Sequence, residues 1–284
     1  MDNHRSKLLA LDLDGTIVSH GFKISKKNMK AMVEFIEKGN QIVFITGRPF
    51  YTSKTVADYF YQKTGKKIPY ICALKGALIY DNINEKVLFE NSINNDLFND
   101  LYNIALKNKM VLTGYCVDDF LERKIQSYNV PKIWWPFLRN KHISKRFGKP
   151  EFNQFNQSNF YKFNLLKKRI GTNLTNVVNE INLKFPEILD VSKTNGLMIE
   201  ITLKNANKSF ALKYVSDLLN IDLKDTIAFG DSGNDLPMLK IAGISVIINA
   251  KKAKKTKFHP DYILNKPIKK ALSYLINKKL LNTM

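Results

Sequence analysis

The chain has 284 residues, of which 44% are hydrophobic, and it carries a formal net charge of +20. This length accommodates one large α/β domain or two ordinary ones, and the hydrophobic content is ample for a core. No apolar run approaches the roughly 20 residues that a membrane-spanning helix needs, and the first residues show no signal-peptide pattern. We therefore expect a cytoplasmic protein that does not insert into a membrane.

The positive charge would suit an anionic partner such as nucleic acid. Lysine is spread along the whole chain, however, and asparagine is abundant beside it, so a solvated surface is the favoured interpretation. The densest basic run, residues 251–257, either lies near substrate phosphate or coats a loop. Cys72 and Cys116 lack metal-ligand spacing and a nearby His, so neither a disulfide framework nor a zinc site is expected.

Two carboxylates follow the first apolar run. Residues 8–11 are short and continuously apolar, which is typical of a strand buried on both faces of a parallel sheet. Asp12 and Asp14 come at its carboxyl end, where such sheets bind ligands. We expect a bend at Gly15 to let both serve one site. Their mutual repulsion calls for a cation, and Mg²⁺ fits because it takes carboxylate and carbonyl oxygens.

Candidate phosphate-binding groups follow a second predicted strand. Apolar residues at helical spacing predict a helix over 26–39, and residues 41–45 read as a buried strand. Thr46 and Gly47 follow that strand. A hydroxyl and a glycine amide at a strand end can hydrogen-bond phosphate oxygens directly. A helix over 53–63 and a third strand over 70–74 come next.

From about residue 85 to residue 200 the pattern changes to hairpin-like and helical pieces with asparagine-rich connections. This indicates an irregular α+β insertion with its own small core. The insertion holds a polar-aromatic tract, whose rings could stack on a substrate ring, although packing within the insertion is the favoured interpretation. The aromatic residues of this tract are Trp134, Trp135, Phe137, Phe152, Phe155, Phe160, Tyr161 and Phe163.

The chain then returns to buried strands and helices. A strand over 196–202 precedes a helix that runs from 205 to about 220. Lys208 lies near the start of this helix, where the helix dipole is already positive, so an anion explains its placement better. A strand over 226–229 leads into Asp231, Asn234 and Asp235, a group that suits one face of a magnesium ion. Short strands over 245–249 and 261–264 end the pattern.

Four short motifs follow one another in an order that resembles that of the haloacid dehalogenase-like phosphatases, in the Cof-type, subclass IIB branch. The pieces are Asp12 to Thr16, Thr46-Gly47, Lys208, and Gly230 to Asp235. The resemblance implies a Rossmann-like, doubly wound parallel sheet core from residues 1–84 and 201–284. It also implies an inserted α+β cap of the C2 type over 85–200 that sets substrate specificity. Lys75 departs from the branch, which usually has Asn there.

The resemblance further implies a Mg²⁺-dependent hydrolysis of small phosphate monoesters. Asp12 would attack phosphorus and form an aspartyl-phosphate, while Asp14 would act as general acid and base. The implied metal ligands are Asp12, the backbone carbonyl of Asp14, Asp231, and Asp235 directly or through water. The implied phosphate-binding groups are Thr46, Gly47, Lys208 and Asn234.

Several alternatives stay open at this point. A phosphomutase would pass the phosphoryl group to a hexose phosphate instead of water. A basic nucleic-acid-binding protein on the same fold would use the net charge, although binding a polyanion calls for no set of four carboxylates. Sugar phosphates, pyridoxal phosphate, flavin mononucleotide and nucleotides all remain candidate substrates. The oligomeric state cannot be derived from the sequence.

Overall fold

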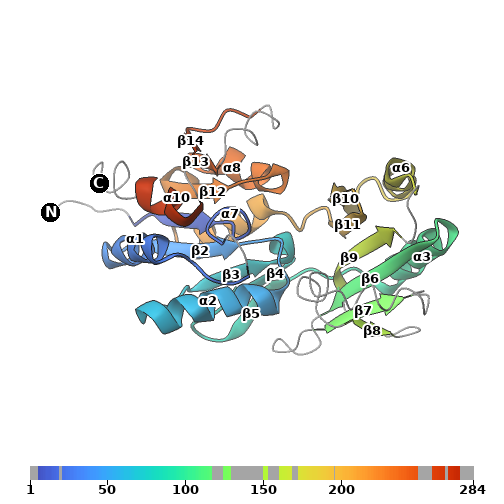
Figure 1. Cartoon of the computed structure of the whole chain (residues 1–284), viewed down its shortest axis with the longest axis horizontal. Helices are drawn as coiled ribbons and strands as arrows, with labels where there is room; N and C mark the ends of the chain where they lie inside the picture. The colour runs from blue at the N-terminus through green and yellow to red at the C-terminus, as the bar shows by residue number, and fades with distance from the viewer. Residues whose placement is uncertain are drawn as a thin grey trace. The chain divides into compact units, whose positions relative to one another are not determined.

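The computed structural model describes residues 6–18, 21–116, 124–128, 150–152, 160–167, 172–194, 196–248, 258–265 and 268–275. The chain divides into two compact units, each with its own β-sheet (Figure 1). The core unit consists of residues 1–90 and 206–284, and the inserted unit consists of residues 91–205.

The two units divide at 90/91 and 205/206, whereas the sequence analysis divides the chain at 84/85 and 200/201. The first difference arises because β5 (Lys86–Glu90) pairs with β4 (Leu78–Asp81) in the sheet of the core unit. The second arises because β11 (Met198–Leu203) continues to Leu203 in the other sheet. That the inserted unit sets specificity stays a prediction.

The core unit is built on one eight-stranded sheet. Its strand order is β14-β13-β12-β1-β2-β3-β4-β5. Neighbours from β14 to β3 are parallel, whereas β4 and β5 add an antiparallel edge. The further strand bounds are β1 (Leu8–Leu11), β2 (Gln41–Ile45), β3 (Tyr70–Ala73), β12 (Thr226–Gly230), β13 (Ile244–Ile248) and β14 (Tyr262–Leu264). The predicted α/β class with a parallel core sheet is confirmed.

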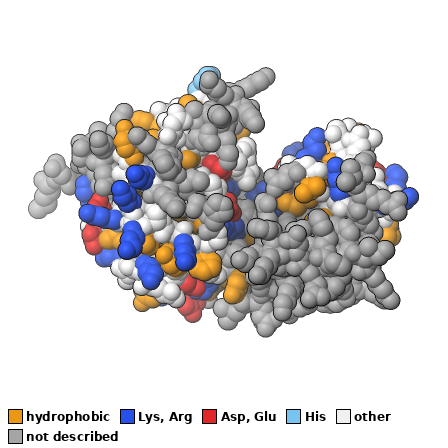
Figure 2. All heavy atoms as spheres, in the orientation of Figure 1, with side chains coloured by type: hydrophobic (Ala, Val, Ile, Leu, Met, Phe, Trp, Pro, Cys, Tyr) orange, Lys and Arg blue, Asp and Glu red, His pale blue; other side chains and the backbone are white. Residues whose placement is uncertain are grey.

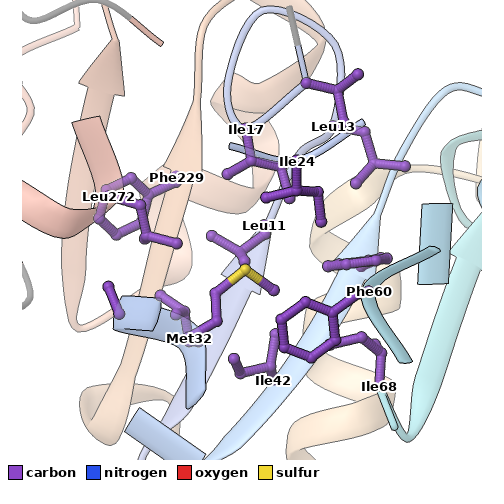
Figure 3. Close-up of a cluster of buried hydrophobic side chains, with 14 of the residues drawn as sticks. Leu11, Leu13, Ile17, Ile24, Met32, Ile42, Phe60, Ile68, Phe229 and Leu272 are labelled. Carbon is purple, nitrogen blue, oxygen red and sulfur yellow. The ribbon is translucent and has the colours of Figure 1, made fainter. Parts of the chain in front are cut away.

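Helices cover both faces of this sheet, so the doubly wound prediction is confirmed as well. Side chains from β1, β2 and β12 meet those of α1, α2 and α10 in one buried cluster (Figure 3). The opposite face packs against α7 and α8 in a second cluster. The helices are α1 (Lys26–Glu37), α2 (Phe50–Thr64), α7 (Lys208–Leu218), α8 (Leu236–Ile241) and α10 (Ile268–Leu275).

Local sequence explains where these helices begin. The Oγ of Ser25 accepts a hydrogen bond from the backbone N–H of Asn28 and caps α1, and Asn207 caps α7 in the same way. Helix α2 begins at Phe50, three residues before the predicted start. Pro49 accounts for this, because a proline donates no backbone hydrogen bond and therefore fits the start of a helix.

The inserted unit has a six-stranded sheet in the order β10-β11-β9-β6-β7-β8, with α3 (Asn95–Lys107) and α6 (Leu174–Lys184) packed against it. The further strands are β6 (Met110–Cys116), β7 (Lys124–Tyr128), β8 (Pro150–Phe152), β9 (Phe160–Lys167) and β10 (Leu189–Thr194). Phe160 and Phe163 lie in the core of this unit, as predicted. Trp134, Trp135, Phe137 and Phe155 fall outside the described residues.

The basic character of the chain is visible on the core unit. Figure 2 shows lysine and arginine side chains over α1 and α2, with acidic side chains beside them. Ion pairs between positions four apart, such as Lys30 with Glu34 and Lys54 with Asp58, account for part of this pattern. The run 251–257 lies outside the described residues. Among the helices that the structure describes, none has the length and apolar character to span a bilayer.

Candidate active site

The site is built where two neighbouring strands of the core sheet end. Strands β1 and β12 pair in register, with Leu11 beside Phe229, and the backbone N–H of Asp12 donates to the carbonyl of Phe229 at 3.1 Å. Asp12 and Asp231 therefore follow adjacent strand ends. One carboxylate oxygen each from Asp12, Asp231 and Asp235 lie within 4.8 Å of one another, and all three residues are buried.

A tight turn brings Asp235 back to this cluster. Its Oδ2 accepts hydrogen bonds from the backbone N–H groups of Asp231 and Ser232, both at 2.9 Å. A Cβ atom at Gly230 would lie 2.4 Å from the Cβ of Asp235, so the turn requires glycine there. With Oδ2 committed to the turn, Oδ1 is the oxygen that Asp235 presents to Lys208.

Gly15 has two reasons to be glycine. Its φ is +80°, in the left-handed region that side chains with a Cβ rarely adopt. A Cβ atom at this position would also lie 2.0 Å from the Oδ2 of Asp231. The glycine that turns the chain after Asp14 thus makes room for a carboxylate from the other half of the core unit.

Lys208 enters the cluster from the first turn of α7, and its side chain is fully buried. Its Nζ lies 2.6 Å from the Oδ1 of Asp12 and 2.5 Å from the Oδ1 of Asp235. From the sequence, this lysine is predicted to bind a phosphate. The structure gives it two carboxylate partners, which are sufficient to explain its buried charge.

Burial raises the pKa of Asp12 to about 7; Lys208 opposes this rise, while Asp235 and Asp231 add to it. For Lys208, burial acts to lower the pKa, but Asp12 and Asp235 outweigh it and raise the pKa. When all three acids are ionised, the single ammonium of Lys208 leaves the buried cluster with two net negative charges. Carboxylate oxygens are the ligands of hard divalent cations, so the donor set and the charge of this cluster fit such an ion.

Thr16 is a contact that the sequence analysis did not assign. Its hydroxyl donates to the Oδ2 of Asp12 at 3.1 Å. Because Lys208 bonds to Oδ1 and Thr16 to Oδ2, the carboxylate of Asp12 is held at both oxygens. The signal was available, since Thr16 lies in the same short motif as Asp12.

Asp14 does not join the cluster. Its side chain is 66% exposed and forms a bidentate ion pair with Arg48, from Nε to Oδ2 at 2.8 Å and from Nη2 to Oδ1 at 2.7 Å. The sequence analysis missed this partner. Arg48 directly follows Thr46-Gly47, and this position in the second motif is the sequence feature that could have indicated a role at the site.

Of the two predicted phosphate groups after β2, Gly47 lies near Asn234. A Cβ atom at Gly47 would lie 3.8 Å from the Nδ2 of Asn234 and 4.0 Å from the Cγ of Lys75. Thr46 is buried, and its hydroxyl accepts a hydrogen bond from the backbone N–H of Arg48 at 3.2 Å. Gly47 thus lies near both Asn234 and the side chain of Lys75.

Lys75 is buried in an unusual turn. Leu74, Lys75 and Gly76 have φ values of 53°, 64° and 101°, three left-handed residues in succession. The backbone N–H of Lys75 donates to the carbonyl of Thr46 at 2.9 Å, which ties the two turns together. Left-handed backbone at a long side chain is strained, and such strain is typical of functional sites.

The chain is similar to several proteins that are named as phosphatases. A candidate phosphatase of Buchnera aphidicola is 28% identical over 253 residues, 85% of this chain and 84% of that protein. The 5-amino-6-(5-phospho-D-ribitylamino)uracil phosphatase of Bacillus subtilis is 26% identical over 247 residues, 84% of this chain and 82% of that protein. A solved subclass IIB sugar phosphatase shares the fold at a TM-score of 0.75 and 19% identity, covering 96% of this chain and 98% of its own.

The family profile described as haloacid dehalogenase-like hydrolase matches residues 9–276, which is nearly the whole chain. This match spans both halves of the core unit and the inserted unit between them. The family expected from the four sequence motifs is therefore confirmed, and the chain belongs to the haloacid dehalogenase-like hydrolases.

Proposed function

We propose that this hydrolase is a Mg²⁺-dependent phosphatase that acts on phosphate monoesters of small metabolites through an aspartyl-phosphate. The observation that carries the proposal is the buried cluster of Asp12, Asp231, Asp235 and Lys208. Uncatalysed hydrolysis of such esters is very slow, and an enzyme must lower its barrier by about 20 kcal/mol. A carboxylate nucleophile divides this task into two easier displacements.

Asp12 is the proposed nucleophile. Thr16 and Lys208 hold one oxygen each, so the carboxylate keeps a fixed orientation toward an incoming phosphorus. An Asp12 oxygen forms the new bond to phosphorus as the bond to the leaving oxygen breaks, and protonated Asp14 supplies that oxygen with its proton. Water then attacks the aspartyl-phosphate, and Asp14 takes a proton from it. Inorganic phosphate leaves, and Asp12 is regenerated.

Asp12, Asp231 and the backbone carbonyl of Asp14 would hold Mg²⁺, with Asp235 as a direct or water-mediated ligand. The bound ion would neutralise charge between the nucleophile and the phosphate and orient the phosphoryl group. Asp235 has only Oδ1 beyond its own turn, and this oxygen also contacts Lys208. This double use favours the water-mediated role for Asp235.

Thr46, the backbone amide of Gly47, Asn234 and Lys208 are the proposed phosphate ligands. Negative charge spreads over the equatorial oxygens in the transition state, so fixed donors aimed at them stabilise that state most. Gly47 permits a close approach of the backbone, and the nearness of Asn234 to Gly47 supports a shared role. Lys208 would serve both Asp12 and a phosphate oxygen.

The inserted unit is the proposed specificity unit, in line with the cap role expected from the sequence. Two similar proteins are named for phosphates of a sugar and of a ribityl-bearing pyrimidine. Both names describe hydroxyl-bearing esters. This supports phosphate esters of a hydroxyl-bearing chain or ring, a class that includes sugar phosphates, flavin mononucleotide and nucleotides, over pyridoxal phosphate. The cytoplasmic location and the transfer to water rather than to a sugar hydroxyl stay predictions.

The test is phosphate release from p-nitrophenyl phosphate by wild type, Asp12→Asn and the control Asp58→Asn. Asp58 is a half-exposed acid on α2 that pairs with Lys54 in its own helix. We expect Asp12→Asn to stay folded and lose at least about a thousandfold in kcat, and Asp58→Asn to match wild type. EDTA should abolish turnover and Mg²⁺ should restore it. Turnover by folded Asp12→Asn would overturn the proposal.

A further inference from the structure

Lys75 follows β3 in the core unit, at the same edge of the sheet at which Asp12 follows β1 and Thr46 follows β2. These three strands are parallel, and parallel sheets bind ligands at the carboxyl ends of their strands. Lys75 is only 5% exposed. A lysine is seldom buried to this degree unless its ammonium group meets a partner or a ligand. Its position and its burial together indicate a role at this edge.

The turn that carries Lys75 is held from two sides. The backbone N–H of Lys75 donates to the carbonyl of Thr46 at 2.9 Å. On the other side, a Cβ atom at Gly76 would lie 2.8 Å from the carbonyl oxygen of Asn207, which caps α7 directly before Lys208. The turn therefore connects the end of β2 with the start of α7, the two places that supply most of the proposed phosphate ligands.

Lysine is a costly residue for this backbone conformation. Its φ is 64°, and glycine or asparagine would adopt such a left-handed conformation more readily. Left-handed backbone at other residue types persists where surrounding contacts enforce it, and it clusters at functional sites. A residue that departs from local preference in this way is expected where its side chain serves a function.

The side chain of Lys75 runs close to Gly47. Its Cγ lies 4.0 Å from a Cβ atom built at Gly47, and the Nδ2 of Asn234 lies 3.8 Å from the same point. The Oδ1 of Asn234 accepts a hydrogen bond from the hydroxyl of Ser232 at 2.6 Å, so the amide nitrogen is the end that faces Gly47. The Nζ of Lys75 is three bonds beyond its Cγ. A lysine, a glycine amide and a side-chain amide donor thus occur together.

The acidic cluster offers little net positive charge to a phosphate. The ammonium of Lys208 lies 2.6 Å and 2.5 Å from carboxylate oxygens of Asp12 and Asp235. With its three acids ionised, the cluster has two net negative charges, which a divalent cation would cancel without a surplus. A phosphate monoester adds about 1.5 to 2 further negative charges. A second lysine near Gly47 would offset part of this charge, and such attraction is stronger in a buried site than in water.

We propose that Lys75 binds the phosphoryl group of the substrate from the side of Gly47 and Asn234, an inference that rests on the proposed phosphatase function. Two lysines then have different main roles. Lys208 orients the nucleophile Asp12, and Lys75 supplies the positive charge that attracts the phosphate. The same contact binds inorganic phosphate after hydrolysis, so the product should inhibit the enzyme through Lys75.

The probe for this role is inorganic phosphate. Its inhibition constant against hydrolysis of p-nitrophenyl phosphate is measured with Mg²⁺ at constant ionic strength, because salt screens the attraction between charges. Lys75→Met removes the charge and keeps a long side chain. The loss of one charged contact should raise the inhibition constant about tenfold. Lys75→Arg keeps a positive charge in another shape, so its inhibition constant should lie between the values of wild type and Lys75→Met.

Lys66→Met is the matched control. Lys66 precedes β3, whereas Lys75 follows it, so the two lysines lie at opposite edges of the same sheet. Lys66 pairs with Glu37 at 3.6 Å, and its loss changes the net charge of the protein by the same amount. Its inhibition constant should equal that of wild type. Lys75→Asn is a second variant without the charge, and it should fold because asparagine adopts left-handed backbone readily.

The outcomes separate the two proposals. A wild-type inhibition constant in folded Lys75→Met and Lys75→Asn would overturn the role of Lys75 and leave the phosphatase proposal standing. An equal rise in Lys66→Met would overturn it too, because the effect would then follow from net charge alone. A wild type that hydrolyses no phosphate monoester with Mg²⁺ would overturn the phosphatase proposal instead. Calorimetric binding of inorganic phosphate to wild type and Lys75→Met would then still test Lys75, and equal affinities would exclude it.

Discussion

Arg48 holds Asp14 in a fork of two parallel hydrogen bonds of 2.8 and 2.7 Å. Bidentate pairs of this kind are among the strongest contacts between exposed charged groups, and they fix direction as well as distance. They also bind the ionised carboxylate, whereas a general acid must carry a proton. If Asp14 delivers a proton to the leaving oxygen, as we propose, it must first separate from Arg48.

Until that separation, Arg48 should act as a positioning residue for Asp14. We expect Arg48→Ala to lower kcat/KM for p-nitrophenyl phosphate roughly 10- to 100-fold, because the freed carboxylate loses its defined place. Arg48→Lys keeps the positive charge but cannot form two parallel hydrogen bonds to the carboxylate. Its kcat/KM should therefore lie between the values of wild type and Arg48→Ala. Steady-state kinetics across pH, with Asp14→Asn as reference, provide the measurement. Wild-type kinetics in Arg48→Ala would show that the pair has no part in turnover.

Much of the site could be predicted from the sequence because its parts sit at strand ends. Asp12 and Asp231 each follow a short apolar run, and parallel strands present their carboxyl ends at one edge. Lys208 could be predicted from its place at a helix start. These assignments need only local patterns and the rule that crossovers between parallel strands of one sheet are right-handed.

Other features depend on contacts that no local pattern contains. The pairing of Asp14 with Arg48 depends on how the turn at Gly15 directs a side chain toward a residue 34 positions away. The pairing of Thr113 with Asn164 depends on the register between β6 and β9, some 50 residues apart in the chain. Such register is decided by tertiary pairing, so the alternating polarity of each strand alone did not reveal it.

The raised pKa of Asp12 predicts a pH-dependent stability in metal-free protein. Its pKa is about 7 in the folded state and 3.8 for the ordinary group, so between these values the folded state retains a proton that the unfolded chain has released. The free energy of unfolding should therefore fall as pH rises through this window, by up to about 4 kcal/mol. Asp12→Asn removes the carboxyl group that takes up this proton. Its melting temperature in EDTA should exceed that of wild type by a margin that grows from about pH 5 to about pH 8.

With Mg²⁺ present, the melting temperature of wild type should instead exceed that of Asp12→Asn. An ion bound by the ionised cluster stabilises the folded state alone, so it should raise the melting temperature of wild type at about pH 8. Asp12→Asn loses one ligand and should gain less. Thermal unfolding with and without Mg²⁺ measures both effects. An equal gain in the two proteins would mean that the ion binds elsewhere.

Gly15→Ala should disable the site by sterics, since the new Cβ would meet the Oδ2 of Asp231 at 2.0 Å. Gly65→Ala is the matched control, because Gly65 has a φ of +72° and nothing within 4 Å of the added atom. The control should lose about 1 kcal/mol of stability from left-handed backbone and keep its activity. Gly15→Ala should lose more stability than this and most of its turnover. Equal losses of stability and turnover in the two variants would show that the close approach of Asp231 to Gly15 affects neither.

Lys75→Asn should separate the effect of backbone strain on stability from the effect of charge on substrate binding. Asparagine adopts left-handed backbone more readily than lysine, so we expect a gain of about 0.5–1 kcal/mol in stability. The same change removes the charge of a side chain whose Cγ lies 4.0 Å from a Cβ built at Gly47, and this loss should raise KM for phosphate monoesters several-fold. Lys75→Met is the control, because it removes the charge and keeps a long side chain at a φ of 64°. It should raise KM without the gain in stability, and an unchanged KM in both variants would exclude Lys75 from phosphate binding.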